Sequence, residues 1–218
     1  MKKAVVVLYP VKQFVDRDLK NPGINCIGLD VFERGYTQAL GLRSGEFRQR
    51  FRRGYDCLLS EYRKGCYGIY WTLFSRQESK KLPATRSFSN VFTKKEEDIL
   101  LPAGISYEDH TNRYRYPNED KLVEKLKKRD VGEAVFGGFH SIDCVPRLCS
   151  VAQRLGLNAR VDKLLTELFF HQMIRTFEQD VFAKAIAAGN LKAEMHEDDP
   201  NEEKVRLFED RIPLEVLS

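Results

Sequence analysis

The stretch from residue 131 to residue 162 constrains the fold of this chain more than any other. Residues 134–136 are apolar, with the β-branched and aromatic character of a strand, and two glycines end this run. After a short turn, apolar residues recur at helical spacing from Cys144 to Leu155, and Gly156 ends the pattern. A cysteine at a helix N-terminus just beyond a strand is therefore predicted, and α/β sheets place their ligands there.

Cys144 is the candidate reactive residue of this stretch. The positive end of a helix dipole favours a thiolate over a thiol and lowers the pKa of a cysteine at that position. The free N–H groups of the first helical turn are also suited to stabilising an oxyanion. The alternative interpretation is a buried structural cysteine, because free cysteines are commonly buried in protein cores.

The rest of the chain alternates strand and helix patterns. Apolar runs predict strands at residues 4–8, 66–74, 131–136 and 159–161. Amphipathic spacing predicts helices at residues 46–64, 121–129, 144–155 and 164–188, with Gly65 at the end of the first helix. This order predicts an α/β fold with a mostly parallel sheet.

Composition narrows the class of protein. A hydrophobic content of 42% fits one sizeable domain, which we place at residues 1–163, followed by a helical C-terminal extension and acidic tail at residues 164–218. The net charge of +4, from 36 basic and 32 acidic residues, is too balanced to indicate nucleic-acid binding. Five cysteines without a CxxC spacing favour free thiols in the cytoplasm. Neither a signal peptide nor a membrane span is predicted.

Two separated stretches resemble isochorismatase-like cysteine hydrolases. Residues 5–16, VVVLYPVKQFVD, are similar to the opening strand and loop of that family, and residues 112–145, which end in GGFHSIDCV, resemble its central stretch. The resemblance spans residues 4–165 and implies a three-layer α/β sandwich. It also implies hydrolysis of a small amide or related C–N bond, or of a vinyl ether as in isochorismate, and a homo-oligomer acting on a small molecule without a cofactor.

The family's site residues carry over as follows. Cys144 matches the nucleophile, the Phe139–His140 bond matches a cis peptide, and the N–H groups of His140 and Cys144 match the oxyanion hole. The catalytic triad is degenerate, because Tyr9 stands where the family has an Asp base and Arg113 stands where it has a Lys. Arginine keeps the positive charge, but a phenol with an unperturbed pKa near ~10 is a poor base at neutral pH.

Other residues are candidates for the missing base. His140 is the best of them, because a Cys–His pair is a known way to activate a thiol. The other candidates, each of which has an ordinary polar loop role as its alternative, are Asp16, Asp18, His110 and Asp143. The family often carries a metal site of one Asp and two His after the second strand. Residues 71–95 contain no His, so we expect no metal there.

Three functions stay open from the sequence. The first is a divergent hydrolase that works through a Cys144 thioester. The second is a catalytically silent family member that serves as a binding or scaffold protein. The third is altered chemistry, in which Tyr9, Arg113 and His140 serve a different substrate.

The C-terminal tail suggests an alternative location for the protein. The segment HEDDPNEEK precedes an apolar C-terminus and is similar to the translocation signals of some bacterial type IV secretion effectors. A secreted effector is therefore the alternative to a cytoplasmic protein. The structural interpretation is a solvated charged segment.

Overall fold

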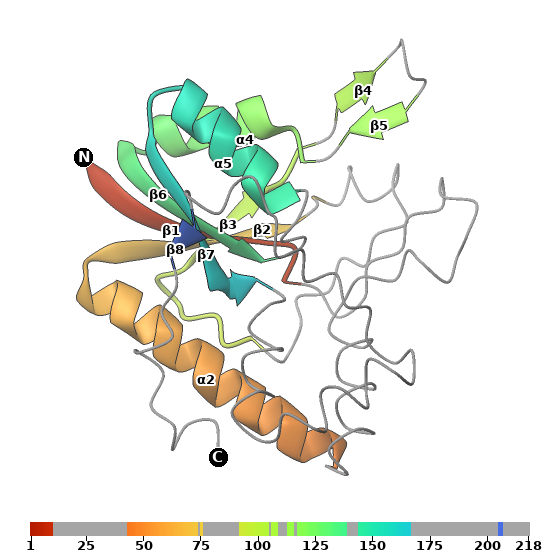
Figure 1. Ribbon diagram of the computed structural model, residues 1–218, viewed down its shortest axis with the longest axis vertical. Coiled ribbons are helices and arrows are strands. Elements are labelled where there is room, and N and C mark those ends of the chain that lie inside the picture. Colours follow the sequence, from red (N-terminus) through yellow and green to blue (C-terminus); the bar gives the residue numbers. More distant parts are fainter. Residues whose placement is uncertain are drawn as a thin grey trace.

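A six-stranded parallel sheet forms the centre of the computed structural model (Figure 1). Its strand order is β3-β2-β1-β6-β7-β8, with bounds Ile99–Pro102, Tyr67–Leu73, Lys2–Leu8, Val131–Gly138, Asn158–Thr166 and Val205–Arg206. The structure describes residues 1–10, 43–73, 75, 92–104, 106–108, 113–115, 117–138, 144–166 and 205–206. The predicted α/β fold with a parallel sheet is confirmed.

The strand order reverses beside β1. From β1 the chain proceeds to β2 and β3 on one side, and it then returns to place β6, β7 and β8 on the other side. The carboxyl ends of β1 and β6 therefore flank a topological switch point, which is where open α/β sheets bind their ligands. β1 also lies directly beside the strand that leads to Cys144, as the resemblance requires.

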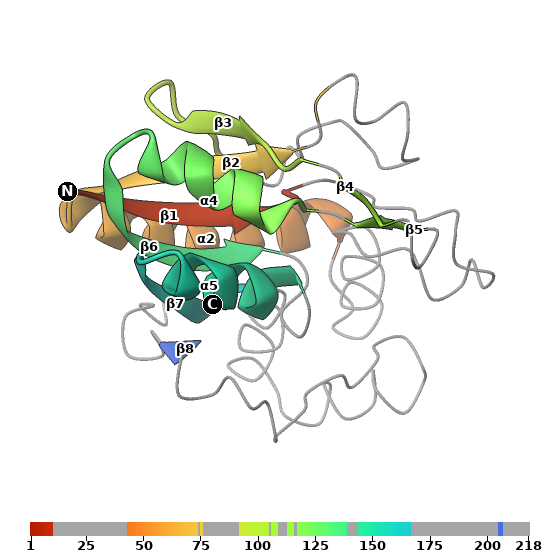
Figure 2. The ribbon, with the colours of Figure 1, turned by 90° about the horizontal axis from the view of Figure 1, so that it is seen from above.

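Helices cover both faces of the sheet. Helix α2, Ser44–Lys64, lies on one face, and helices α4, Glu119–Lys127, and α5, Cys144–Arg154, lie on the other (Figure 2). Because β1 is central and covered on both sides, its residues 4–8 are fully buried. The continuous apolar run in the sequence follows from this double burial.

The three predicted helices of the main domain are confirmed with small changes at their ends. Asn118 caps α4, since its side chain accepts a hydrogen bond from Lys121 N at 3.1 Å. Gly65 lies at the end of α2 as expected, although the left-handed φ of 63° belongs to Cys66. Gly156 follows α5 with φ 87°, the conformation that favours glycine after a helix.

Two parts of residues 164–218, the expected helical extension and acidic tail, are strands. β7 continues to Thr166, so the expected boundary at residue 164 falls inside this strand, and Val205–Arg206 forms β8 beside it. Leu164 and Leu165 are buried because they belong to the sheet. The remaining residues of the predicted helix 164–188 lie outside the described part of the chain, and the division into two units stays a prediction.

Two further elements were not predicted as strands. β3 is a short edge strand that ends in a proline, which explains its weak sequence signal. β4, Ser106–Glu108, and β5, Arg113–Arg115, form a separate antiparallel hairpin. Figure 2 shows this hairpin beyond the carboxyl ends of the sheet strands.

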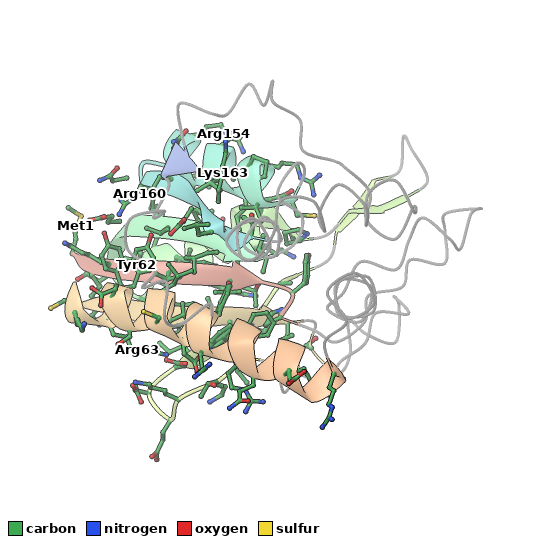
Figure 3. The ribbon with its side chains drawn as sticks, turned by 60° about the horizontal axis from the view of Figure 1, so that its bottom comes forward. Met1, Tyr62, Arg63, Arg154, Arg160 and Lys163 are labelled. Carbon is green, nitrogen blue, oxygen red and sulfur yellow. The ribbon has the colours of Figure 1, made fainter. Side chains whose placement is uncertain are left out.

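A charged cluster joins four neighbouring strands at the amino end of the sheet. Glu133 on β6 accepts hydrogen bonds from Tyr67 on β2 and from Arg160 on β7, the latter at 2.7 Å, and it pairs with Lys3 on β1 at 3.9 Å. Tyr62 of α2 packs edge-on against Tyr67 with ring centroids 5.1 Å apart. Figure 3 shows Met1, Arg160 and Tyr62 at this end, with Tyr62 between α2 and the sheet.

The cluster changes the ionisation of its acid. Burial alone would raise the pKa of Glu133, but hydrogen bonds from Tyr67 and Arg160 and the charges of Arg160 and Lys3 outweigh it and lower this pKa. The pKa of Arg160 is raised, because the contacts with Glu133 and Tyr67 outweigh the opposing effect of its burial. The carboxylate and the guanidinium thus stabilise each other in their charged forms.

Candidate active site

Cys144 lies at the carboxyl end of the sheet, as the sequence predicts. It is the first residue of α5, six positions after β6 ends at Gly138, and only 4% of its surface is exposed. α5 packs against β6 and β7. The thiol therefore lies at the positive end of a helix and beside the switch point between β1 and β6.

The two glycines that end β6 permit a close approach of its neighbours. A Cβ atom on Gly138 would lie 2.1 Å from the carbonyl oxygen of Leu8 in β1, and one on Gly137 would lie 2.4 Å from Cβ of Leu165 in β7. Gly138 also has φ 97°, which side chains rarely adopt. The GG pair of the turn motif is thus required by packing on both sides of β6.

An irregular stretch of β7 supplies one of these close contacts. The pairing of β7 with β6 shifts between Phe136 and Gly138, so that Gly138 pairs with Thr166. The hydroxyl of Tyr55 on α2, the helix on the face of the sheet opposite α5, donates to the carbonyl oxygen of Leu165 at 2.7 Å. α2 thereby anchors the part of β7 that packs against Gly137.

Tyr9, the residue at the position of the expected base, follows β1 in a left-handed conformation with φ 51°. Its N–H group donates to the carbonyl oxygen of Thr72 at 3.0 Å, and its ring is only 1% exposed within the core. A bulky residue with positive φ is unusual, and such backbone strain concentrates at functional sites. Tyr9 and Cys144 both follow strands that meet at this edge, since Leu8 pairs with Gly138.

An arginine that the sequence reasoning missed lies beside the thiol. Nη2 of Arg147, one helical turn after Cys144, donates to the Cys144 sulfur at 3.8 Å. Nε of the same guanidinium donates to a carboxylate oxygen of Glu119, the first residue of α4, whose side chain is only 5% exposed. The i,i+3 spacing of Cys144 and Arg147 on a helix was the available signal.

The remaining predicted site residues lie at the edge of what the structure describes or outside it. Arg113 begins β5, opposite Glu108, and its side chain is outside the described part. Several other predictions concern residues outside the described part of the chain and stay predictions. They are the cis peptide at Phe139 and His140, the oxyanion-hole role of His140, and the alternative bases Asp16, Asp18, His110 and Asp143. Within the described ranges, no group of three or more His, Cys, Asp or Glu could hold a metal ion.

Comparisons with known proteins give structural matches only. No protein-family model matches the chain, and no curated protein sequence matches it significantly. Among solved structures, an isochorismatase-like hydrolase from Alkaliphilus metalliredigens matches with a TM-score of 0.42 and 11% identity, over 86% of this chain and 90% of that one. An isochorismatase family protein matches with a TM-score of 0.40 and 13% identity, over 75% and 80%.

What the structure itself shows is the fold class, a parallel sheet between two helical layers with a cysteine beyond the strand beside β1. Among the described helices, none is long and apolar enough to cross a membrane.

Proposed function

We propose that this chain is a divergent isochorismatase-like hydrolase that cleaves a small amide or related C–N bond through a thioester on Cys144. The observation that carries the proposal is the position of the thiol. It begins α5 at the switch point of the sheet, and the guanidinium of Arg147 donates to its sulfur at 3.8 Å. Thiols beside an arginine and at a helix N-terminus are the reactive ones in proteins.

The reaction follows from this arrangement. Cys144 loses its proton to water, and its thiolate sulfur forms a bond with the substrate's carbonyl carbon. The C–N bond then breaks, and the leaving nitrogen takes a proton from water, which leaves a thioester. A water molecule cleaves the thioester, releases a carboxylic acid and returns the thiol. In this scheme the N–H group of Cys144, in the first turn of α5, donates to the oxyanion of the intermediate.

A catalytically silent binding protein is the second candidate, and Tyr9 favours it. The carboxylate that the family places after the first strand is absent, and a buried aromatic ring occupies this position. General-base catalysis typically contributes ~10²–10⁴-fold to a rate, so its loss is enough to silence an enzyme of modest activity. The fold is then kept for ligand binding alone.

A substrate screen separates the two candidates. Purified protein is incubated with amides and ureido acids, release of the amine is measured, and mass spectrometry is used to find an acyl adduct on the Cys144 peptide. The proposal expects turnover of at least one compound and its loss in Cys144→Ala. Equal turnover in Cys144→Ala, or binding of the compounds without turnover or adduct, would contradict the hydrolase.

A further inference from the structure

We propose that Arg147, held in place by Glu119, is the cation that stabilises the Cys144 thiolate, a role the family resemblance assigns to Arg113. The inference rests on the proposed function, in which Cys144 is the nucleophile. It adds a residue from α5 and a residue from α4 to the site. Arg147 lies outside the two stretches that carry the resemblance, and Glu119 lies inside residues 112–145 but matches none of the family's site residues named above.

The geometry of the guanidinium supports this role. Its Nη2 lies 3.8 Å from the Cys144 sulfur, while its Nε bonds the carboxylate of Glu119, so one planar group joins an acid on α4 to the thiol on α5. Arginine presents several donors in a fixed plane, and a partner on one donor orients the others. A charge-assisted hydrogen bond to sulfur stabilises the thiolate more than the thiol.

Few other charged groups face this end of α5 in the described structure. From α4 the facing group is Glu119, and the carboxyl half of β6, residues 134–138, has no titratable side chain. β1 contributes Tyr9 at its end. On β7, Arg160 bonds Tyr67 and Asp162 bonds Tyr62 of α2, which places both on the opposite face of the sheet, and Lys163 is the remaining charged residue of this strand.

Thiolate titration tests the inference without needing a substrate. The ultraviolet absorbance of the thiolate is followed against pH, and the signal of Cys144 is taken as the difference between each protein and the same protein carrying Cys144→Ser. Removing an adjacent opposite charge shifts a pKa by about 1–3 units. Arg147→Gln should therefore raise the titration midpoint of Cys144 by about one pH unit or more, and Arg147→Lys should recover part of that shift.

The chain offers a matched control and a comparison. Arg154 lies in the last turn of the same helix and also pairs with a residue of α4, Asp120, at 2.9 Å. Arg154→Gln should leave the titration midpoint of Cys144 unchanged. Arg113→Gln removes the cation that the resemblance favours. A larger shift in Arg113→Gln than in Arg147→Gln, or equal midpoints in Arg147→Gln and wild type, would overturn the inference.

A double variant guards against unfolding. Arg147→Gln alone buries the Glu119 carboxylate without its arginine, whereas Glu119→Gln with Arg147→Gln keeps a neutral pair of similar size. The double variant should also raise the midpoint, and an unchanged midpoint there would count against Arg147. A raised midpoint in a protein that hydrolyses no amide would refute the proposed function while leaving the role of Arg147 intact.

Discussion

The two ends of the central sheet use the same neighbouring strands in different ways. At the amino end, side chains from β1, β2, β6 and β7 form one cluster around Glu133 in which opposite charges and hydrogen bonds meet. At the carboxyl end, backbones approach so closely that glycines are required, and Tyr9 and Gly138 both have positive φ. The first arrangement joins side chains of opposite charge, and the second packs backbones closely beside the thiol.

The two ends therefore differ in what holds the neighbouring strands together, which is charge pairing between side chains at one end and close backbone packing at the other. Backbone strain persists only where the surrounding packing determines the conformation, and it gathers at sites that do something other than fold. The amino end also has positive φ, at Cys66 (63°) and Asp130 (64°), which directly precede β2 and β6, but the cluster residues Lys3, Tyr67, Glu133 and Arg160 do not have it. The following predictions test whether the two ends differ in this way.

The largest effect is expected from Gly138→Ala. The new methyl group would meet the Leu8 carbonyl at 2.1 Å in a backbone with φ 97°. Strain and overpacking together should lower the free energy of unfolding by about 3–5 kcal/mol, measured by urea denaturation. Gly156→Ala is the matched control, because φ is 87° but nothing lies within 4 Å. It should cost only about 1 kcal/mol, and equal losses in both variants would contradict the importance of the close approach.

Tyr9→Asp is expected to have the next largest effect. Removing a buried ring should lower stability by about 2–4 kcal/mol, although aspartate tolerates a positive φ better than tyrosine. If the missing base limits the reaction, the same change should raise amide turnover, up to the ~10²–10⁴-fold of general-base catalysis. Melting temperature and hydrolysis are measured on one preparation, with Tyr9→Phe as the control that keeps the ring.

The opposite result for Tyr9 is equally informative. A wild-type protein that hydrolyses an amide efficiently, and loses that activity in Tyr9→Asp, would show that Tyr9 takes part in the reaction. The silent-protein candidate would then be wrong. The altered-chemistry hypothesis, with Tyr9 among its residues, would gain support instead.

The sequence predicts the interior of this fold well, because local pattern and burial agree there. A central parallel strand must be apolar on both faces, so residues 4–8 identify β1 without any tertiary information. β7 is harder, because Asp162 and Lys163 interrupt its apolar run. Asp162 is nevertheless fully buried, where it accepts a hydrogen bond from Tyr62, 100 positions earlier in the chain, at 2.8 Å.

The candidate site likewise has one part that the sequence predicts and one part that it does not. Cys144 could be found from the strand, the glycines and the helical spacing around it, and the structure places it at the start of α5. The position of Arg147 could not be predicted from the local sequence, because its partner Glu119 lies 28 positions away on another helix. Local pattern therefore locates the candidate nucleophile, whereas its electrostatic surroundings depend on how α4 and α5 pack.

At the amino end, Glu133→Gln should lower stability by about 1–3 kcal/mol at neutral pH. The change removes the charge that Arg160 and Lys3 share, and Glu133 is partly buried. Urea denaturation measures the loss. The control is Arg154→Gln, which breaks an ion pair whose side chains are 66% and 64% exposed and which should change stability by about 0–1 kcal/mol. Equal losses would show that the cluster has no special role.

The smallest expected effect is the pH dependence of that contribution. The folded protein lowers the pKa of Glu133, chiefly because hydrogen bonds from Tyr67 and Arg160 outweigh the opposing effect of burial. The unfolded chain therefore binds this proton more readily, so stability falls as pH drops from the ordinary glutamate value, ~4.3, through the lower folded value. Above that range the contribution is complete. Unfolding free energies from neutral to acidic pH should show a shallower acid loss in Glu133→Gln than in wild type, while Arg154→Gln should follow the wild-type slope. Parallel slopes in all three proteins would mean that Glu133 ionises alike in the folded and unfolded chains. The amino end would then lack the electrostatic stabilisation that distinguishes it from the closely packed carboxyl end.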